Sequence, residues 1–381
     1  MCLCGTASAG DFAQAVIEYQ PAPGQFINNP WFNDPSRVLG PPLGGGTTDP
    51  DETDLVSLGG IGGSIIIAFD QTVMDDPRNP HGLDAIVFSN AFWNVGDPTY
   101  RFDEPTIIEI SKDVNQNGQP DDFWYVIPGT HLPPVPTDSY VTQLWDNVAG
   151  NGTPPDNLAW YPDSVIYPWI GPSYSTHGFL LTPSLPDPSG ALEVVWGYGE
   201  LSPTLLLGDL SGATGSAWDN SLTDPVDQPG MAPECFYTVP DDPMVVGIDP
   251  YSGGGDAFDI AWAVVPSNGD LANIDGFDFI RLRTGQDLIQ GPLGEVSGEI
   301  DAVADVRAVG DINSDDSVNG SDLGLLLGAW NTNNPCMDLN RDQNVDGADL
   351  GILLGNWDEG LAAQKAALIR SLDQRIRKDI R

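Results

Sequence analysis

Hydrophobic and polar residues alternate in short runs along residues 11–306, and Gly, Pro, Asn and Asp separate these runs. A period of two predicts β-strands that bury one face. The clearest predicted strands are Ser64–Phe69, Ala85–Ser89, Thr106–Ser111, Phe123–Ile127, Leu192–Trp196 and Phe277–Arg283. Another strand is expected over Asp256–Val264, where Phe258, Ile260, Trp262 and Val264 fall on one face. This pattern is typical of a β-sandwich, so the chain is expected to be mainly β.

The period changes to that of a helix after residue 307. Two sets of apolar residues share the spacing i, i+3, i+4, i+7: Leu323, Leu326, Leu327 and Trp330, then Leu350, Leu353, Leu354 and Trp357. Each set predicts a short helix with one apolar face. Glycines four residues apart are expected where the helices approach closely: Gly324 with Gly328, and Gly351 with Gly355. Residues 307–358 are therefore expected to form a small all-α domain.

These helices belong to an internal repeat with an offset of 27 residues. Asp311–Trp330 reads DINSDDSVNGSDLGLLLGAW, Asp338–Trp357 reads DLNRDQNVDGADLGILLGNW, and twelve of the twenty positions are identical. In both copies oxygen donors occupy positions 1, 3, 5, 7, 9 and 12 of the loop before the helix, with the main-chain carbonyl at position 7. The donors of the first copy are Asp311, Asn313, Asp315, Ser317, Asn319 and Asp322. Those of the second copy are Asp338, Asn340, Asp342, Asn344, Asp346 and Asp349.

This donor spacing suits calcium. Calcium is a hard cation that takes six to eight oxygen ligands, and a twelve-residue loop of this kind wraps around one ion. Without the ion, carboxylates about 5 Å apart repel by roughly 3 kcal/mol per pair at an effective dielectric constant near 20. We therefore predict two Ca2+ sites in residues 307–358, and a module that loosens or unfolds when calcium is removed.

A loop followed by one helix, duplicated, with Asp at position 12, resembles the type I dockerin module. The pattern DLGxLLGxW is similar to planctomycete dockerin-like repeats, and the resemblance covers about residues 307–358. It implies calcium-dependent folding and docking to a cohesin-like module or another cell-surface protein. The chain departs from the family at position 6, where Asp316 and Gln343 replace the usual Gly. It also departs at positions 10 and 11, which help to select the cohesin and here are Gly320-Ser321 and Gly347-Ala348.

A third acidic loop lies in the segment DVNQNGQPDD, between two predicted strands of the large domain. Its donors at positions 1, 3, 5, 7 and 9 are Asp113, Asn115, Asn117, the carbonyl of Gln119, and Asp121. Trp124 stands at position 12, so a further ligand has to come from elsewhere, with Asp122 as the candidate. The pattern predicts a third, structural Ca2+ site in the β-sandwich. The alternative is an Asn-Gly turn without a ligand.

Several longer phrases characterise residues 20–305: VLGPPLGGG, IVFSNAF, EPTIIEISKDVNQNGQPDDFWYVIPG, WGYGELSPTLLLGD and GGGDAFDIAWAV. In these phrases the domain resembles secreted bacterial surface proteins of unassigned role. The resemblance implies a jelly-roll-like β-sandwich and an extracellular location. It implies no activity.

The charge of the chain bears on its partners. Its 381 residues include 55 acidic and 14 basic side chains, a formal net charge of −41, and 45 of the acids are Asp against 10 Glu. Asp is a poor helix former but a good turn residue and calcium ligand. Nucleic acid is not expected as a partner, because a field this negative repels phosphate. Adaptation to salt is an alternative source of the charge.

The two ends of the sequence differ from the rest. Residues 359–381 are expected to form a basic helical tail, since residues 360–381 contain six Lys/Arg and two Asp. Residues 1–10 are interpreted as the remnant of a signal peptide, because Ala7-Ser8-Ala9 is a small-x-small pattern that signal peptidase accepts; an ordinary N-terminus is the alternative. No apolar run approaches the ~20 residues that a transmembrane helix needs. We expect a secreted or cell-surface protein.

The function of the large domain is the least explicit part of the sequence. Residues 130–190 are dense in Pro and are expected to make a long excursion over the surface. Five aromatic residues there are candidates for stacking on sugar rings, or else they cover the sandwich: Trp160, Tyr161, Tyr167, Trp169 and Tyr174.

Sequence motifs for catalysis are missing, since no GxSxG, HExxH or phosphate-binding loop is present. Two acidic pairs are candidates for glycoside hydrolysis: Glu104 with Glu109, and Glu299 with Asp301. In a chain with 55 acids such pairs also arise from composition. The main hypothesis is a non-catalytic, glycan-binding or adhesive surface protein. A polysaccharide-degrading enzyme and a purely structural surface or matrix protein are the alternatives.

Overall fold

The computed structural model describes residues 10–358 apart from 23–25, 28, 61, 94–95, 97, 99–100, 103, 105, 128–197, 212–219, 244–246, 267–270, 285–288, 291–293, 296 and 316. The chain divides into two compact units. The β-rich unit comprises Ala9–Pro77 and His81–Val306. The loop–helix unit comprises Arg78–Pro80 together with the described residues from Arg307 onward.

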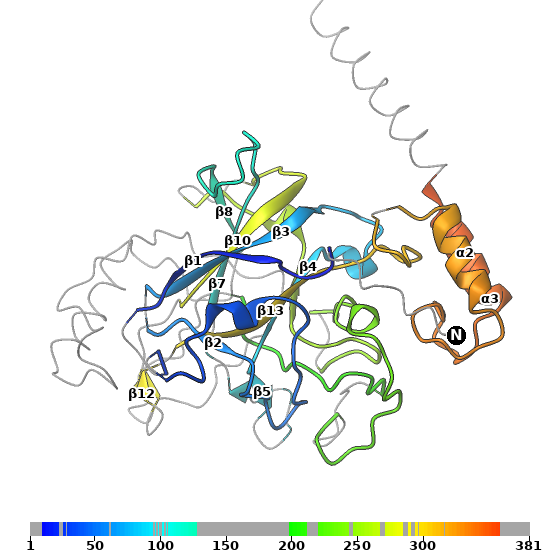
Figure 1. The fold of residues 1–381 in the computed structure, drawn as a ribbon, viewed down its shortest axis with the longest axis horizontal. Coiled ribbons are helices and arrows are strands. Elements are labelled where there is room, and N and C mark those ends of the chain that lie inside the picture. The colour runs from blue at the N-terminus through cyan, green and yellow to red at the C-terminus, as the bar shows by residue number, and fades with distance from the viewer. Residues whose placement is uncertain are drawn as a thin grey trace, which may run out of the picture. The chain divides into compact units, whose positions relative to one another are not determined.

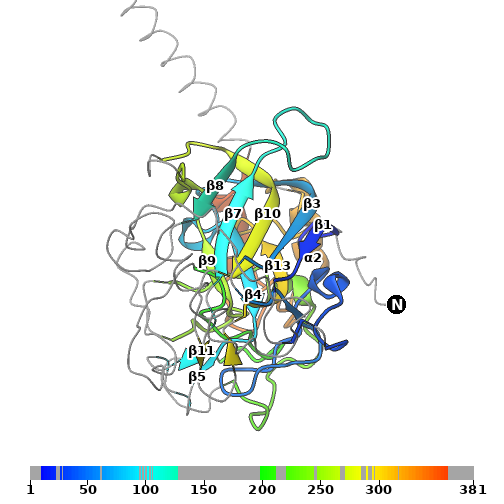
Figure 2. The ribbon, with the colours of Figure 1, turned by 90° about the vertical axis from the view of Figure 1, so that its left-hand side faces the viewer.

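The β-rich unit contains two larger sheets in which all strand pairs are antiparallel (Figure 1, Figure 2). The first has the order β1 (Ala15–Gln20), β3 (Ser64–Met74), β10 (Gly276–Thr284), β7 (Thr106–Ser111) and β8 (Trp124–Ile127). The second has the order β2 (Val56–Ser57), β13 (Glu299–Asp305), β4 (Ala85–Ser89) and β9 (Asp256–Phe258). Two short antiparallel pairs join β5 (Phe92–Trp93) to β6 (Arg101–Phe102), and β11 (Ile289–Gln290) to β12 (Gly294–Glu295). The described chain is therefore mainly β.

The alternating pattern located five of the thirteen strands among the described residues. Strands β3, β4, β7, β8 and β10 confirm the predicted strands, and β4 and β7 have the predicted bounds. Short 3-10 helices occur at Pro35–Val38, Pro80–Gly82, Pro233–Cys235 and Ile260–Trp262. The predicted strand Leu192–Trp196, the Pro-rich stretch 130–190, the tail 359–381 and residues 1–9 lie outside the described residues.

The prediction of one strand over Asp256–Val264 was wrong. Strand β9 ends at Phe258, and residues Ile260–Trp262 form a 3-10 helix. The side chain of Asp259 accepts a hydrogen bond from the Ala261 amide at 2.7 Å, which caps this helix. An Asp that bonds the backbone two residues on favours a turn over an extended strand, whatever the period of its neighbours.

The main apolar core draws side chains from both larger sheets. Ile65 and Ile67 of β3 and Leu282 of β10 share this core with Val87 of β4 and Val303 of β13, and all five are fully buried. A second apolar cluster includes Ile86 and Phe88 of β4 together with residues of the segment 205–248. Strand β4 is thus buried on both faces, which explains why all of its residues are apolar or small.

In the described part of the loop–helix unit, two α-helices, α2 (Gly320–Gly328) and α3 (Gly347–Gly355), lie side by side (Figure 1). Its core consists of the buried residues Val318, Leu326, Ala329, Val345 and Leu353, with Leu323, Leu350 and Trp357 packed against them. No helix among the described residues is both long and apolar enough to cross a membrane.

Two expectations about these helices were wrong. Leu327 and Leu354 are about half exposed, at 50% and 53%, and Trp330 is 37% exposed. The buried side of α2 instead runs through Asp322, Leu326 and Ala329. Leu327 directly follows Leu326, and adjacent residues of a helix are rotated by about 100°, so its side chain points away from this buried side. The glycines do not mark a close approach either, since a Cβ added at Gly324, Gly328, Gly351 or Gly355 would meet nothing within 4 Å.

Candidate functional site

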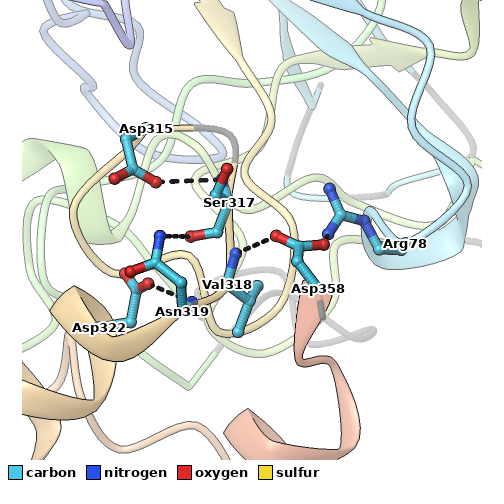
Figure 3. A network of polar contacts seen from close by, with 7 residues as sticks. All are labelled: Arg78, Asp315, Ser317, Val318, Asn319, Asp322 and Asp358. Carbon is cyan, nitrogen blue, oxygen red and sulfur yellow. Dashed lines mark hydrogen bonds and ion pairs between the residues drawn. The ribbon is translucent and has the colours of Figure 1, made fainter. Parts of the chain in front are cut away.

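The first predicted calcium loop, residues 311–322, is closed by the carboxylate at its last position. Asp322 is fully buried, and its Oδ1 accepts hydrogen bonds from the amides of Ile312 at 2.8 Å and Asn313 at 3.2 Å. Its Oδ2 accepts from the Asn319 amide at 2.8 Å (Figure 3). One side chain therefore fixes both the start and the end of the loop.

The remaining acids of this loop turn toward the same centre. Asp311 Oδ1 accepts from the Asp315 amide at 3.2 Å, and Asp315 Oδ1 accepts from the Ser317 amide at 3.1 Å (Figure 3). One carboxylate oxygen each from Asp311, Asp315 and Asp322 lies within 4.8 Å of the other two. Burial, together with the nearby Asp322 and Asp315 carboxylates, raises the pKa of Asp311 to about 7. The arrangement concentrates negative charge in a way that a cation would relieve.

The second loop, residues 338–349, repeats this pattern of hydrogen bonds. Asp349 Oδ1 accepts from the Asn340 amide at 3.0 Å and Oδ2 from the Asp346 amide at 2.7 Å. Asp338 Oδ1 accepts from the Asp342 amide at 3.1 Å, and Asp342 Oδ1 accepts from the Asn344 amide at 3.0 Å. The repeat in sequence is thus a repeat in hydrogen bonding.

Position 9 of each loop also starts the following helix. Asn319 accepts from the Ser321 amide at 2.8 Å, and Asp346 accepts from the Ala348 amide at 2.7 Å. Each is the N-cap of a capping box completed by the Asp at position 12. Helix and loop are therefore one cooperative element, because the same acids serve both.

The donor set of the first loop fits calcium. Asn313 Oδ1, at position 3, is buried and no donor among the described residues reaches it. A buried acceptor without a donor costs free energy unless something binds it. Carboxylate, amide and main-chain oxygens are the ligands that calcium prefers. When bound, the ion would neutralise charge at Asp311, Asp315 and Asp322, supply a partner for Asn313 Oδ1, and tie the loop to the helix.

The third loop, residues 113–121, lies in the hairpin between β7 and β8 and has the same pattern. Asp113 Oδ1 accepts from the Asn117 amide at 3.0 Å, as position 1 does from position 5 in the other loops. Asn117 Oδ1 accepts from the Gln119 amide at 2.7 Å, as position 5 does from position 7. Asp121 accepts from the side-chain amides of Asn115 at 3.0 Å and Asn117 at 3.1 Å. All five predicted donors thus belong to one closed loop.

The missing position 12 of this loop has a substitute. Asp122 Oδ2 accepts from the Val114 amide, at position 2, at 3.0 Å. In the first loop the position-2 amide of Ile312 donates to the position-12 carboxylate, Asp322. Asp122 therefore makes one of the hydrogen bonds that a carboxylate at position 12 makes in the first loop, where this loop has Trp124.

The three loops also share backbone conformation. Position 4 is left-handed in each, with φ of 56° at Ser314, 64° at Arg341 and 57° at Gln116. Position 6 is left-handed at Gln343 (φ 70°) and Gly118 (φ 69°). A side chain such as that of Gln343 tolerates this conformation at a cost of about 1 kcal/mol, so the Gly usual at this position is not required for the turn.

One residue of the first loop's network was missed by the sequence reasoning. Asp358 Oδ2 accepts from the Val318 amide at 2.5 Å, its own amide donates to the Val318 carbonyl at 3.0 Å, and its Oδ1 pairs with Arg78 of the same unit (Figure 3). In the other repeat, Asn331 and Thr332 bond the main chain of Val345 in the same manner. The signal was present: Asp358 directly follows the repeat, where Asn331 follows the first copy.

The acids named as candidates for hydrolysis, Glu104, Glu109, Glu299 and Asp301, are all buried. Glu109 binds Arg281 and Arg283 of β10, and Asp301 accepts from the Leu43 amide at 3.0 Å. Glu104 and Glu299 instead lie near each other, both almost fully buried. None of these four carboxylates is exposed to a polymer.

Comparisons with known proteins name no relative. No protein-family model matches the chain, and no curated protein matches its sequence. Its function must therefore be inferred from the loops and from the two units that carry them.

Proposed function

We propose that this chain is a secreted, calcium-binding modular surface protein. A non-catalytic, jelly-roll-like β-sandwich that binds glycans or mediates adhesion is attached to a partner through a dockerin-like loop–helix module. The observation that carries the proposal is the hydrogen-bond pattern that the three loops share. In each, positions 1 and 5 accept main-chain amides in the same order. In the first loop, carboxylate oxygens of Asp311, Asp315 and Asp322 also lie within 4.8 Å of one another.

The helices offer a surface for docking. Gly320, Gly324 and Gly328 stand before and after Leu327 in α2, and Gly347, Gly351 and Gly355 stand before and after Leu354 in α3. A Cβ at any of these six glycines would meet nothing within 4 Å. The helices therefore expose large apolar side chains, Leu325 and Leu327 on α2 and Leu354 on α3, next to glycines without side chains, which lets a partner approach closely. The two faces are related by the repeat, as expected if either copy can bind the same partner.

Two further observations support export and a binding role. Cys235 and Cys336 are both disulfide-bonded, and disulfides persist mainly in oxidising compartments outside the cytoplasm. The burial of Glu104 and Glu299 and the ion pairs of Glu109 leave the candidate acid pairs without access to a polysaccharide. The glycan-binding part of the proposal rests on the aromatic residues of the 130–190 stretch.

Calcium titration of the full chain by calorimetry, followed by metal analysis, tests the central point. Asp311→Ala with Asp338→Ala, at position 1 of both repeats, should remove two bound ions per chain. Asp113→Ala should remove one. Lys112→Ala is the matched control, since it lies beside the third loop but is not a ligand. Unchanged calcium content in the double variant would refute the proposal for the module.

A glycan array with the calcium-loaded chain tests the β-rich unit. Binding to a defined sugar that is lost in Trp160→Ala or Trp169→Ala supports glycan recognition. Release of reducing ends from a bound glycan would instead favour the enzyme, and a blank array would favour a structural surface protein.

A further inference from the structure

Three glutamates that are distant in sequence meet inside the β-rich unit. Glu104 precedes β7, Glu200 follows Gly199, which bridges to Thr106 at the start of β7, and Glu299 opens β13. One carboxylate oxygen of each lies within 4.8 Å of the other two. Their exposed fractions are only 2%, 1% and 1%. Because β7 and β13 belong to different sheets, the cluster joins the two sheets at one end.

Few hydrogen-bond donors among the described residues face the carboxylate oxygens of this cluster. Glu104 Oε1 accepts from the Ser297 amide at 3.3 Å, and Glu200 Oε2 accepts from the Glu299 amide at 2.9 Å. Glu299 Oε1 accepts from the Ser297 hydroxyl at 2.6 Å. Its other oxygen, Oε2, is buried and no donor among the described residues reaches it.

Such a carboxylate is costly unless a cation or a proton accompanies it. Burial raises the pKa of Glu299, although side-chain hydrogen bonds, first with Glu104 and then with Ser297, Ser57 and Asn90, lower it in part. A buried, ionised carboxylate without compensation is among the most unfavourable groups in a protein interior. Two carboxylates beside it add like-charge repulsion.

We propose that Glu104, Glu200 and Glu299 bind one calcium ion that ties the two sheets together. This site is separate from the three loops, and it does not depend on the function proposed for them. Its ligands come from three segments that only folding brings together, so the ion would hold the ends of β7 and β13 in place.

The chemistry of the donors selects the cation. All three donors are carboxylates. The Ser297 hydroxyl donates to Glu299, and the hydroxyl oxygens of Ser57 and Ser297 are 3.2 Å apart. Oxygen donors favour hard cations, whereas zinc sites are built mainly from Cys and His. Magnesium requires near-ideal octahedral geometry, whereas calcium accepts irregular arrangements of six to eight oxygens. Three glutamates from separate segments, with oxygens within 4.8 Å of one another, therefore suit calcium better.

The rival explanation is that the three carboxyl groups share protons instead of an ion. The two cases differ in metal content and in the response to chelator, so both measurements are needed. Full-length wild type, Glu299→Gln and Glu109→Gln are equilibrated at the same free calcium concentration, and bound metal is counted by mass spectrometry. Glu109→Gln is the matched control, because it makes the same substitution at a buried glutamate of the same unit that pairs with arginines.

We expect Glu299→Gln to bind one calcium ion fewer per chain than wild type, and Glu109→Gln to bind the same number as wild type. Equal calcium content in Glu299→Gln and wild type would overturn the proposal in favour of shared protons. Loss of ions from the Asp311→Ala, Asp338→Ala variant is read separately, so failure of the loops and failure of this site are distinguishable.

Hydrogen exchange on the wild type keeps the test decisive if Glu299→Gln does not fold. Removing calcium should speed exchange about tenfold or more at residues 297–301 and 106–108, because the ion stabilises only the folded arrangement. Exchange that changes in the loops alone, and not in these two segments, would also overturn the proposal.

Discussion

The two units bury very different amounts of apolar side chain. Among the described residues, the largest core of the β-rich unit contains 23 buried residues from both sheets, whereas the loop–helix unit has five. Ordering each residue costs about 1–2 kcal/mol of backbone entropy, and apolar burial is the main term that offsets it. The small unit has a smaller apolar core and places buried acids in its loops. Its stability must therefore come in large part from what those acids bind.

The units also compensate their acids differently. In the β-rich unit, Glu109 lies against Arg281 and Arg283, and the Arg281 guanidinium lies 4.4 Å from the centre of the Trp124 ring. In the loop–helix unit, Asp322 and Asp349 accept main-chain amides at both ends of their loops. Amide dipoles orient a carboxylate but leave its charge, whereas an arginine neutralises it. Arginines therefore compensate Glu109 in the β-rich unit, whereas the loops of the loop–helix unit are prepared for an ion.

Calcium removal should separate the units most strongly. In hydrogen exchange of the full chain, chelator should remove protection from residues 311–357 and leave the centres of β3 and β10 protected. A ligand at a thousand times its dissociation constant stabilises by about 4 kcal/mol, which corresponds to roughly a thousandfold in exchange. Adding calcium back should restore protection, and the same concentration of magnesium should not. Equal loss in both units would show that they do not differ in this way.

A pair of leucine substitutions tests how the small core is built. Leu326→Ala should lower the free energy of unfolding of the loop–helix unit by about 2–5 kcal/mol, because the side chain is fully buried. Leu327→Ala is the control one residue away and should change it by less than about 0.5 kcal/mol, since that leucine is half exposed. Thermal unfolding in calcium measures both. Similar losses would contradict the buried stripe through Asp322, Leu326 and Ala329.

The strands were predictable where the local pattern decides the structure. β4 and β7 have their predicted bounds because most of their residues are apolar or β-branched and they lie between turn residues. The strand expected over Asp256–Val264 failed because one hydrogen bond, donated by the Ala261 amide to the Asp259 carboxylate, outweighs the period of two. The segment 205–248 that covers the second sheet has no period at all, so its packing role was invisible in the sequence.

The candidate sites likewise differ in whether their residues lie close together in the sequence. Loop donors lie within twelve residues of one another, so spacing alone brings them together. Asp122 was foreseen as a replacement because it is adjacent, and Asp358 was missed because its partner Val318 lies 40 residues away. Glu104, Glu200 and Glu299 have no local signal, since only the pairing of two sheets brings them into contact. Exposure of Leu327 was missed because apolar spacing does not say which side of a short helix is covered.

The stability of the β-rich unit should depend on pH through Asp84. Its oxygens accept from the amides of Asp76 at 3.0 Å and Ile260 at 2.9 Å, and burial raises its pKa from 3.8 to about 7. The folded unit therefore holds a proton that the unfolded chain releases between pH 4 and pH 7. Stability falls as pH rises through that window and is level above it.

The slope for one such proton is at most about 1.4 kcal/mol per pH unit. Denaturant unfolding of the β-rich unit in chelator, from pH 4 to pH 8, should show a shallower decline for Asp84→Asn than for wild type. Calcium-loaded loops should respond with the opposite sign, because acid protonates their ligands. Parallel curves for wild type and Asp84→Asn would exclude a proton at Asp84.

Glycine substitutions give the smallest effect and the most direct contrast between the units. Gly351 lies in the interior of α3 with open space around it, so Gly351→Ala should stabilise the loop–helix unit by about 0.5–1 kcal/mol through helix propensity. Gly63 is the matched position in the β-rich unit, where an added Cβ would lie 1.8 Å from the Leu58 carbonyl oxygen. Gly63→Ala must therefore destabilise, with the opposite sign. Because Gly351 also belongs to the proposed docking face, its alanine variant should fold more stably and bind the partner less well. A gain in stability with unchanged partner binding would remove that glycine from the interface while leaving the calcium module intact.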